Sequence, residues 1–368
     1  MSKLDNLGNV LIRSDLNVPI KNGEITDNFR ILKSVEILES ILDKSRTITF
    51  TSHMGRPNGK DLNLSLRPVA ESMSDFLGKE VRFIEEIFGE KVEEQIEKSE
   101  SKIFLLENLR FEKGEIENDK EFSNQITKPF NSYIFDAFGA AHREHASVVS
   151  FGENLESFQG PLMDKEIHEL DRLLNNSESG YTVLLGGAKI SDKLNLIEKL
   201  LPKVEYLMVG GGMCFTLLKA LGHEIGRSLL EESFISKAEE LLNSRFGKKI
   251  ILPIDFGVTD SIDSSVRENV KLEDFKNNHI GVDIGPQTVS NFKKILKKSN
   301  NIFWNGPMGI FEKEAFSYGT KEITEIISNS SAYTFIGGGD SVSAINKFSD
   351  KKYFNHISTG GGASLEYL

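Results

Sequence analysis

Residues 181–201, YTVLLGGAKISDKLNLIEKLL, carry the pattern that decides the fold. The first five residues form an apolar run, which is typical of a strand buried on both faces of a parallel sheet. The second half has the apolar spacing of a helix, and two glycines stand at the junction. Two lysines follow the glycines, and we expect Lys189 and Lys193 to share one face of the helix. Two like charges at this spacing weaken an isolated helix by a few tenths of a kcal/mol, so the pair needs an explanation.

The same alternation of apolar runs and helical patterns continues along the whole chain. The runs that predict strands are NVLIRSDL (9–16), RTITFTSH (46–53), KIFLLENL (102–109), SYIFDAF (132–138), TVLLGG (182–187), EYLMVGGG (205–212), KIILPIDF (249–256), NIFWNG (301–306), YTFIGGG (333–339) and HISTGGG (356–362). Strands that alternate with helices in this way form parallel sheets covered on both faces. The fold class that we predict is α/β, with two Rossmann-like, doubly wound parallel-sheet domains joined by a connector helix and hinge.

The stretch GPLMDKEIHELDRLLNN separates two such series, and its apolar stripe predicts the connector helix. We expect a first domain over 1–160, the connector and hinge over 161–178, and a second domain over 179–355. The C-terminal segment 356–368 is expected to lie near the hinge. The hinge elements are expected to be residues 162–176 and the segment HISTGGGASLEYL.

Composition narrows the classes of function. The chain has 368 residues, one cysteine and a formal net charge of -11, with a pI of about 5.3. The negative charge argues against non-specific binding to nucleic acid or to anionic membranes. No apolar run approaches the length of a membrane span, the start lacks a signal-peptide pattern, and a single cysteine fits a reducing compartment. We therefore expect a cytoplasmic protein, and a monomer.

Four glycine-rich turns mark the second half: LLGGAK, VGGGMCF, FIGGGDS and STGGGAS. Glycine lets the backbone approach a ligand, and a helix that starts behind it offers free N–H groups to a phosphate. Several such turns at parallel strand ends indicate one nucleotide crevice, although plain tight turns are the alternative. The chain has neither a Walker A loop nor the G-x-G-x-x-G fingerprint. Asp340 is either an ordinary acidic residue at a helix start or a carboxylate that faces Mg²⁺ on the phosphates.

Arginines and histidines mark the first half instead. The motifs RSDLNVP, TDNFRI, TSHMGRP, LLENLRFEKGE and DAFGAAHREHAS adjoin predicted strand ends, and they supply Asp15, Asn17, Arg30, His53, Arg56, Arg110 and Arg143. Guanidinium groups bind carboxylates and phosphates in a bidentate manner, so this set predicts an anion pocket. His142 and His145 lie three residues apart, but without a third ligand at a useful spacing they are more typical of hydrogen-bonded structural histidines than of a metal site.

Together with WNGPMGIFE and LPIDF, these motifs resemble those of the phosphoglycerate kinase family of the bacterial type, in the family's order and spacing, from about Asp15 to the C-terminus. The resemblance implies a first domain that binds 3-phosphoglycerate or 1,3-bisphosphoglycerate and a second that binds ATP or ADP with Mg²⁺. It implies that the substrate is bound by Asp15, Asn17, Arg30, His53, Arg56, Arg110 and Arg143. It implies that the catalytic set is Arg30, Lys189, Gly337 and Gly360.

The resemblance likewise implies the nucleotide ligands: Gly186, Lys189, Lys193, Gly210, Gly211, Asn305, Glu312, Gly338, Gly339, Asp340 and Ser341. In this family Glu312 would reach the ribose and Asp340 would be linked to the metal, while Gly187 and Gly361 would adjoin the site. A polyphosphate between Lys189 and Lys193 would turn their repulsion into a favourable interaction. Because the two substrates are assigned to separate domains, hinge closure is implied for the transfer step.

The chain departs from the family at a few points. It is shorter than typical members at both ends and stops at Leu368, which we expect to affect closure and stability between the domains. Ser341 replaces a usual threonine, Ala140 replaces another beside the His142–Arg143 pair, and SDLN replaces VDFN. Two other hypotheses remain open: a catalytically silent relative that binds nucleotide or acts as a scaffold, and a different α/β nucleotide enzyme such as a dehydrogenase.

Overall fold

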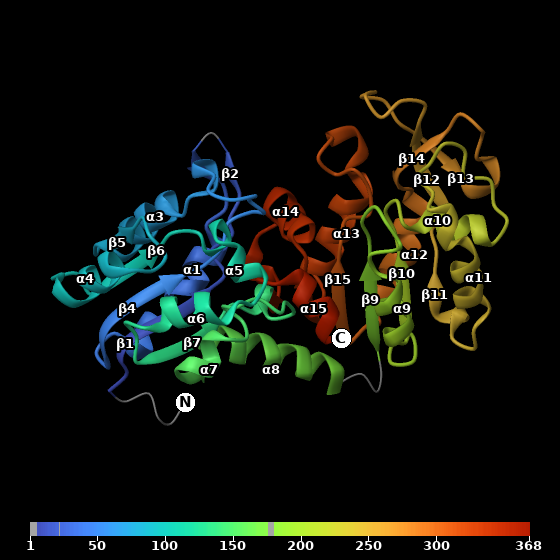
Figure 1. Cartoon of the computed structure of the whole chain (residues 1–368). Coiled ribbons are helices and arrows are strands. Elements are labelled where there is room, and N and C mark those ends of the chain that lie inside the picture. Colours follow the sequence, from blue (N-terminus) through green and yellow to red (C-terminus); the bar gives the residue numbers. More distant parts are fainter. Residues whose placement is uncertain (1–5, 22, 176–179) are drawn as a thin grey trace. The chain divides into compact units, whose positions relative to one another are not determined.

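The computed structural model describes residues 6–21, 23–175 and 180–368. The chain forms two compact units, Met1–Ile167 (unit 1) and His168–Leu368 (unit 2). The division falls within helix α8 (Pro161–Asn175), the expected connector helix (Figure 1). Residues 176–178 of the predicted connector lie outside the described residues, and the bounds of the four predicted segments stay predictions. Within the described ranges, no helix is long and apolar enough to cross a membrane.

A parallel sheet of six strands forms the centre of unit 1. Its strands are β1 (Gly8–Ser14), β4 (Ser45–Thr51), β5 (Val81–Ile84), β6 (Ile103–Leu106), β7 (Ser132–Asp136) and β8 (Glu156–Gln159). Their order across the sheet is β5-β6-β4-β1-β7-β8, and every neighbouring pair is parallel. A small antiparallel hairpin, β2 (Ile20–Lys21) and β3 (Glu24–Ile25), follows β1. The helices of this unit are α1 (Phe29–Val35), α2 (Leu38–Ile41), α3 (Arg67–Leu77), α4 (Glu90–Lys98), α5 (Lys113–Ile116), α6 (Lys120–Thr127) and α7 (Phe151–Asn154), with 3-10 turns η1 (Leu62–Leu64), η2 (Leu109–Phe111) and η3 (Phe138–Ala140).

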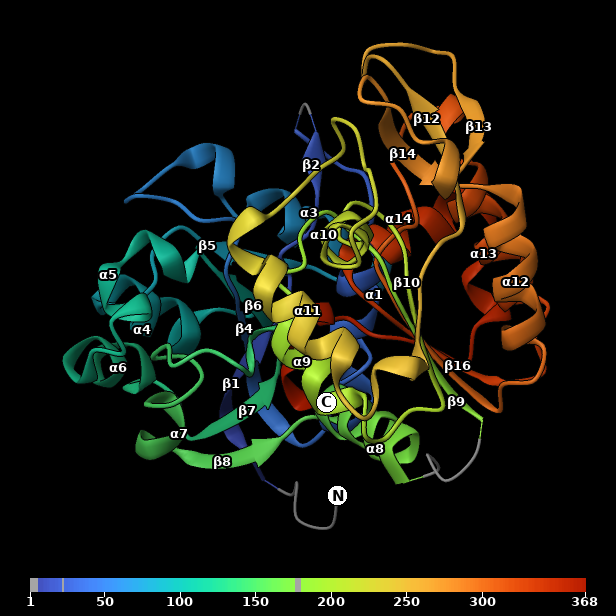
Figure 2. The same ribbon diagram turned by 90° about the vertical axis from the view of Figure 1, so that its right-hand side faces the viewer.

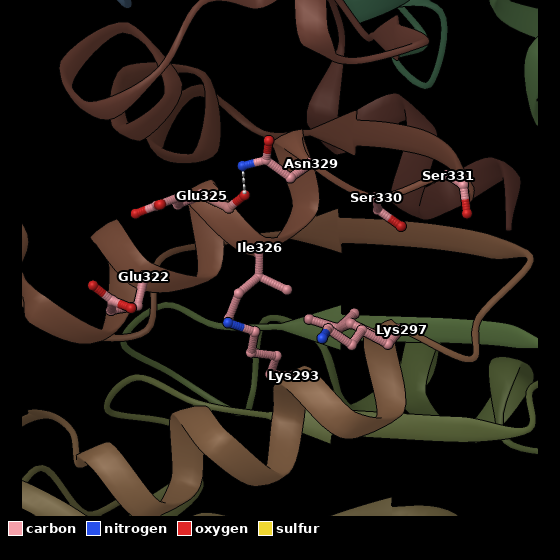
Figure 3. Close-up of a pocket in the computed structure, with 9 residues that line it drawn as sticks. Lys293, Lys297, Glu322, Glu325, Ile326, Asn329, Ser330 and Ser331 are labelled. Atoms are coloured by element: carbon pink, nitrogen blue, oxygen red, sulfur yellow. Dashed lines mark hydrogen bonds between the residues drawn. The ribbon is translucent and has the colours of Figure 1, made fainter.

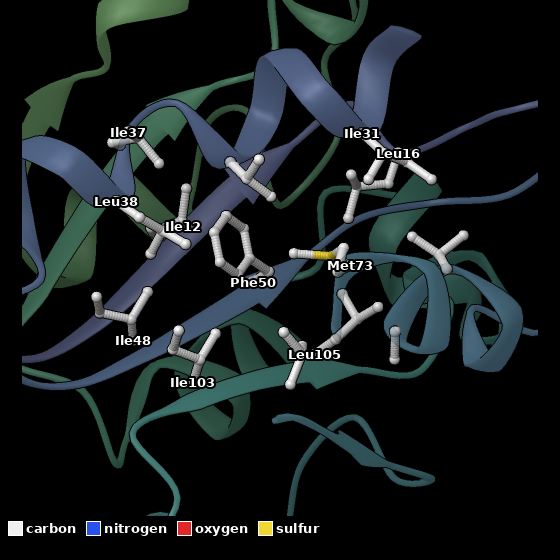
Figure 4. Packing of buried hydrophobic residues seen from close by; sticks show 14 of the residues in the cluster. Ile12, Leu16, Ile31, Ile37, Leu38, Ile48, Phe50, Met73, Ile103 and Leu105 are labelled. Atoms are coloured by element: carbon white, nitrogen blue, oxygen red, sulfur yellow. The ribbon is translucent and has the colours of Figure 1, made fainter. Parts of the chain in front are cut away.

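Both faces of this sheet are buried. Successive side chains of a strand point to opposite faces, so Leu11 and Ile12 of β1 enter different cores. Ile12 packs in a cluster with Phe50 of β4 and Met73 of α3 (Figure 4). Leu11 belongs to a second cluster with Phe122 of α6. Burial on both faces explains why the strands read as continuous apolar runs, and it confirms the predicted doubly wound class for this unit.

Unit 2 repeats this architecture around a second parallel sheet. Its strands are β9 (Tyr181–Leu185), β10 (Tyr206–Val209), β11 (Ile250–Ile251), β15 (Asn301–Asn305), β16 (Tyr333–Gly337) and β17 (His356–Ile357). The order is β11-β10-β9-β15-β16-β17, again parallel throughout. The helices are α9 (Leu194–Leu200), α10 (Cys214–Ala220), α11 (Ile235–Asn243), α12 (Pro286–Leu296), α13 (Tyr318–Ser328), α14 (Gly339–Phe348) and α15 (Gly361–Tyr367), with 3-10 turns η4 (Glu232–Phe234), η5 (Gly247–Lys249), η6 (Leu272–Asp274), η7 (Glu314–Phe316) and η8 (Lys351–Tyr353). Helices α12 and α13 lie side by side (Figure 2).

One predicted strand of this unit is wrong as a single element. Residues 249–256 contain β11 at the edge of the parallel sheet and the start of β12 (Asp255–Thr259), which belongs to a separate sheet. Pro253 lies between the two and has no N–H to donate to a ladder, so one strand cannot run through it. The separate sheet is antiparallel, with the order β13-β12-β14, where β13 is Glu268–Lys271 and β14 is Ile280–Ile284. The sequence analysis did not predict β13, because most of its residues are exposed and so form no apolar run.

Strand order locates the candidate sites. In unit 1 the chain turns from one side of the sheet to the other between β1 and β7, and in unit 2 it does so between β9 and β15. Ligands of open α/β sheets bind at the carboxyl ends of the strands on either side of such a switch point. The predicted polar side chains of unit 1 and the glycine turns of unit 2 follow these strand ends.

Candidate active site

Five predicted substrate residues of unit 1 come from neighbouring strand ends or from α1. Asp15 follows β1, His53 follows β4, Arg110 lies in η2 after β6, and Arg143 follows η3, which comes after β7. Arg30 lies in the first turn of α1. Because β6, β4, β1 and β7 are consecutive in the sheet, their carboxyl ends lie at one edge, and the loops converge there.

A chain of hydrogen bonds joins three members of this set, Arg30, Asp15 and Arg110. Nη1 of Arg30 donates to Oδ1 of Asp15 at 3.2 Å and to the carbonyl oxygen of Asn17 at 2.8 Å. The side-chain oxygen of Asn17 accepts from the N–H of Gly55 at 3.0 Å. The carbonyl oxygen of Gly55 accepts from Nη1 of Arg110 at 2.6 Å. The two loops after β1 and β4, the first helix and η2 are therefore fixed to one another around the site.

The cluster holds more positive charge than it neutralises internally. Burial and the nearby charge of Arg143 lower the pKa of Arg110 to about 10. Burial and the charge of Arg56, which is itself exposed, lower the pKa of Arg143. Nε and Nη2 of Arg110 and Nε of Arg143 are buried without a hydrogen-bond partner. Buried donors without partners cost free energy, and an anion with several oxygens supplies acceptors and opposite charge together.

The histidines of unit 1 divide into two environments. His53 is almost fully buried, and burial together with the charges of the surrounding arginines, first Arg13, lowers its pKa well below the ordinary value. His53 is therefore neutral at physiological pH. His145 lies 3.7 Å from the carboxylate of Glu115. No group of three potential metal ligands was found among the described residues.

In unit 2 the glycine turns after β9 and β10 pack directly on each other and on the turn after β15, at the switch point. The N–H of Gly187 donates to the carbonyl oxygen of Pro307 at 2.9 Å, and the N–H of Gly211 donates to that of Met308 at 3.1 Å. Gly211 has a φ of +65°, and a Cβ at this position would lie 2.5 Å from the carbonyl oxygen of Gly187. Only glycine fits there without a shift of the backbone. The turns after β9, β10 and β15 therefore form one surface.

The expected helical face with two lysines is wrong. Helix α9 begins only at Leu194, and Lys193 is its N-cap residue, while Lys189 is exposed in the preceding loop. Glu231 explains this, because its carboxylate accepts from the N–H of Ser191 at 3.0 Å and from its hydroxyl at 2.6 Å. These bonds hold residues 188–193 as a turn. Lys189 and Lys193 therefore do not repel each other on one face of a helix.

Lys193 turns its ammonium toward the strand ends. Its Nζ donates to the carbonyl oxygens of Gly186 at 2.5 Å and Asn305 at 2.9 Å. Burial lowers the pKa of Lys193 to about 8, against the opposing effect of the Asp340 and Asp192 charges. The ammonium thus lies between β9 and β15, at the switch point of the sheet.

A cavity of about 450 Å³ opens beside these turns. Three residues of the predicted site line it, namely Gly211, Glu312 and Asp340, and so does Gly187, which was expected to adjoin the site. Sequence reasoning missed its apolar wall, which includes Phe215, Leu229, Phe256, Ile284, Met308 and Ile310. These residues come partly from the unpredicted antiparallel sheet, and an apolar residue in a sequence carries no mark that separates a cavity wall from a core. The cavity combines an apolar slot with a polar rim, which suits a flat ring that carries charged groups.

The start of α14 forms part of this rim. Asp340 is exposed in the first turn of the helix, whereas Ser341 is buried and its hydroxyl accepts from the N–H of Gly306 at 2.7 Å. A Cβ on Gly361, the first residue of α15, would lie 2.2 Å from the N of Gly338. Helix α15 therefore packs tightly on the turn that precedes α14.

The remaining predicted residues also lie at these strand ends. Gly210 follows β10, Asn305 and Gly337 end β15 and β16, Gly339 begins α14 and Gly360 is the N-cap residue of α15. A second hollow of unit 2, of about 340 Å³, lies between α12 and α13 and is lined by charged residues such as Lys293 and Glu325 (Figure 3). None of the predicted site residues lines it, so the candidate site of this unit is the cavity beside the glycine turns.

Comparison with known proteins identifies the family. The family model described as phosphoglycerate kinase matches residues 4–368. The phosphoglycerate kinase of Dictyoglomus turgidum is 43% identical over 364 residues, which is 98% of this chain and 92% of that protein. That of Salinispora arenicola is 44% identical over 369 residues, with the same coverage. Among solved structures, phosphoglycerate kinase from Coxiella burnetii matches with a TM-score of 0.83 and 35% identity, over 99% of this chain and 93% of that one. The enzyme from Pyrococcus horikoshii matches with a TM-score of 0.88 and 31% identity, again over 99% and 93%.

Proposed function

The chain belongs to the phosphoglycerate kinase family, and from this membership we propose that unit 1 binds the phosphoglycerate and unit 2 binds the nucleotide. The reaction of the family is reversible phosphoryl transfer between 1,3-bisphosphoglycerate and ADP, which gives 3-phosphoglycerate and ATP. A catalytically silent relative is not favoured, because Arg30, Lys189, Lys193 and Asp340 are all retained.

One observation carries the assignment of unit 1: buried guanidinium donors of Arg110 and Arg143 have no partner in a cluster with excess positive charge. A phosphate group offers acceptors for such donors, and arginine pairs with it in a bidentate manner. We assign phosphoglycerate binding to Asp15, Asn17, Arg30, His53, Arg56, Arg110 and Arg143. The carboxylate that accepts the phosphoryl group is already ionised at neutral pH, so the site needs no general base.

In unit 2 the apolar slot would receive the adenine ring, with Glu312 at the ribose. The phosphates would lie along the glycine turns, where the ammonium group of Lys193 and the N-terminus of α14 provide positive charge. This assignment covers Gly186, Lys189, Lys193, Gly210, Gly211, Asn305, Glu312, Gly338, Gly339, Asp340 and Ser341. The exposed carboxylate of Asp340 on the cavity rim fits a magnesium ion that takes most of its other ligands from phosphates and water. Such an ion would neutralise charge on the nucleotide phosphates.

The chemical step requires alignment and positive charge more than covalent help. We assign Arg30 and Lys189 to the transferring phosphoryl group, with Gly337 and Gly360 offering backbone N–H groups beside it. Because the two substrates are assigned to different units, transfer in line requires closure about hinge elements at 162–175 and 356–368 (residue 176 of the predicted hinge lies outside the described residues). The proposal further includes a monomeric cytoplasmic enzyme without nucleic-acid or membrane partners.

The first test is an assay of 3-phosphoglycerate phosphorylation by MgATP, coupled to NADH oxidation through glyceraldehyde-3-phosphate dehydrogenase. We expect turnover, and we expect Arg30→Ala to lower kcat by about 10³-fold, the lower end of the range for a cation on a transferring phosphoryl group. Arg46→Ala is the matched control, because Arg46 is exposed near the start of β4. A folded protein that binds MgADP but does not turn over would contradict the proposal, as would an Arg30→Ala variant with wild-type kcat.

A further inference from the structure

Besides the four arginines of the predicted substrate set, unit 1 has a buried arginine, Arg13, that contacts His53 of this set and was not among the predicted site residues. It sits on β1, and only 1% of its surface is exposed. Its Nε donates to the hydroxyl of Ser147 at 2.8 Å, and Nη1 donates to the carbonyl oxygen of Ser14 and to the hydroxyl of Ser52 at 3.3 Å. Its Nη2 lies 2.8 Å from Nδ1 of His53. Arg13 is too deeply buried to contact the substrate directly, so any effect of Arg13 on the substrate is exerted through these partners.

The contact with His53 has only one possible polarity. A guanidinium has five N–H donors and no acceptor, so Nδ1 of His53 must accept and carry no proton. The neutral imidazole then holds its proton on Nε2. The carbonyl oxygen of Ser14 and the hydroxyl of Ser147 occupy the other edges of the guanidinium, so it cannot turn away from the histidine. The structure therefore selects one tautomer of His53.

A buried carboxylate holds Arg13 from behind. Oε1 of Glu115 accepts from the hydroxyl of Ser147 at 2.7 Å, and Oε2 accepts from its N–H at 3.0 Å. The carbonyl oxygen of Ser147 accepts from the hydroxyl of Tyr133. Burial alone would raise the pKa of Glu115, but the His145 hydrogen bond and the Arg13 charge lower it below its ordinary value. Glu115 is thus the anion that balances Arg13, with Ser147 as the link between them.

We propose that Arg13 is a positioning residue that fixes His53 as the tautomer with its proton on Nε2, so that this histidine meets phosphoglycerate as a neutral hydrogen-bond donor. The inference rests on the proposed substrate site of unit 1. It explains why a histidine surrounded by cations does not simply add another charge. A fixed N–H supplies direction to a phosphate or carboxylate oxygen, whereas a free ring would present a lone pair in half of its tautomers.

The tautomer can be measured without any variant of Arg13. We would record long-range ¹H–¹⁵N correlation spectra of the ligand-free protein with ¹⁵N-labelled histidine, and assign His53 by the signals that vanish in His53→Gln. We expect the pattern of the Nε2–H tautomer, unchanged between about pH 5.5 and 8. The charged groups that face this ring are Arg13, Arg30, Arg110 and Arg143, and all of them remain cations across that range. An Nδ1–H pattern, or a ring that protonates near its ordinary pKa, would overturn the proposal whatever the activity.

Variants then test the link to substrate. In Arg13→Met we expect mixed tautomers of His53 and a rise of about tenfold or more in KM for 3-phosphoglycerate, with a smaller change in kcat. The pKa of His53 should rise toward its ordinary value in this variant, because the charge of Arg13 no longer lowers it, but burial and the charges of Arg110, Arg143 and Arg30 still hold it below that value. Arg13→Lys keeps a cationic donor and should restore part of both signals. Arg46 is an exposed arginine near the start of β4, so Arg46→Met is the matched control and should leave KM unchanged.

Loss of Arg13 alone leaves Glu115 as an unbalanced buried charge, which is strongly destabilising. The double variant Arg13→Met/Glu115→Gln removes both charges and keeps the test possible if the single variant does not fold. A single Nε2–H tautomer that persists in either folded variant would overturn the proposal. If wild-type protein shows the expected tautomer but no kinase activity, the positioning of His53 stands and the proposed function fails.

Discussion

We expect the unfolding free energy of unit 1 to depend on pH through the buried carboxyl group of Asp136. This residue ends β7 and is fully buried. Its Oδ1 accepts from the N–H groups of Leu162 at 2.8 Å and Met163 at 3.1 Å, in the first turn of α8. Its Oδ2 is buried without a hydrogen-bond partner. Burial raises the pKa of Asp136 from 3.8 to about 6, and the two backbone hydrogen bonds oppose this only in part.

The sign follows from proton linkage. Between about pH 4 and 6 the unfolded chain loses the Asp136 proton while the folded chain keeps it, so the folded state binds more protons and its stability falls as pH rises. A shift from 3.8 to about 6 corresponds to about 3 kcal/mol over the whole window. From the same two pKa values, about 2 kcal/mol of this loss falls between pH 4.5 and 7.5.

Asp136→Asn removes the titration and keeps an oxygen for the two N–H groups of α8. The variant differs from wild type in absolute stability, because the new amide group is buried. Its pH dependence is the diagnostic quantity. We expect the unfolding free energy of wild type, minus that of the variant, to fall by about 2 kcal/mol between pH 4.5 and 7.5. Contributions of all other titrating groups cancel in the difference.

The assay must report unit 1 by itself. The single tryptophan, Trp304, lies in unit 2, so its fluorescence follows the other unit. Urea titrations at each pH should be read by pulsed hydrogen exchange on the peptide that contains β7, with labelling at one fixed pH. A difference between wild type and variant that stays constant across this range would refute the reasoning, because it would show that Asp136 titrates equally in the folded and unfolded chain.

Two further predictions concern unit 2. Because burial lowers the pKa of Lys193 to about 8, we expect the affinity for MgADP to fall as pH rises through about 8, and Lys193→Arg to remove this dependence in calorimetric titrations between pH 7 and 9. Gly211→Ala places a Cβ 2.5 Å from the carbonyl oxygen of Gly187 at a φ of +65°. We expect about 1–3 kcal/mol of backbone strain, which corresponds to a loss of about 5- to 140-fold in MgADP affinity. Wild-type affinity in the alanine variant would contradict the close packing of the turns.

The parts of the fold that sequence could predict share one physical cause. Strands such as β1 and β15 are buried on both faces, and a strand in this position needs apolar residues at nearly every position, which appear in the sequence as a continuous apolar run. β13 has no such requirement, since most of it is exposed, and its pairing with β12 depends on contacts that no local pattern records. The loop from 188 to 193 was mistaken for a helix for a related reason. Its turn is held by Glu231, a partner forty residues away.

The candidate site divides along the same line. Charged side chains at strand ends are unusual enough to be noticed, and in the structure hydrogen bonds link Asp15, Arg30 and Arg110 through the loops after β1 and β4. Sequence reasoning overlooked Arg13. The sequence did contain a signal, since a lone arginine inside the apolar run NVLIRSDL must have a buried partner. The apolar wall of the cavity beside the glycine turns has no comparable signal in the sequence. In the sequence its residues resemble core residues, and only the folded structure shows that they face a cavity.

The proposed anion sites of the two units differ in their physical basis, and this difference predicts different sensitivities to substitution. Unit 1 concentrates guanidinium groups, so each cation repels the others, and removal of one weakens binding while it relieves repulsion in the free protein. Unit 2 relies on turns in which backbone N–H groups and a helix start meet at distances that exclude a Cβ. There the addition of one methyl group does more harm than the loss of a charge at the rim. Substitution of Arg110 or Arg143 should therefore lower the affinity for phosphoglycerate with little or even favourable effect on the stability of unit 1. Substitutions of the packed glycines in unit 2 should lower affinity and stability together.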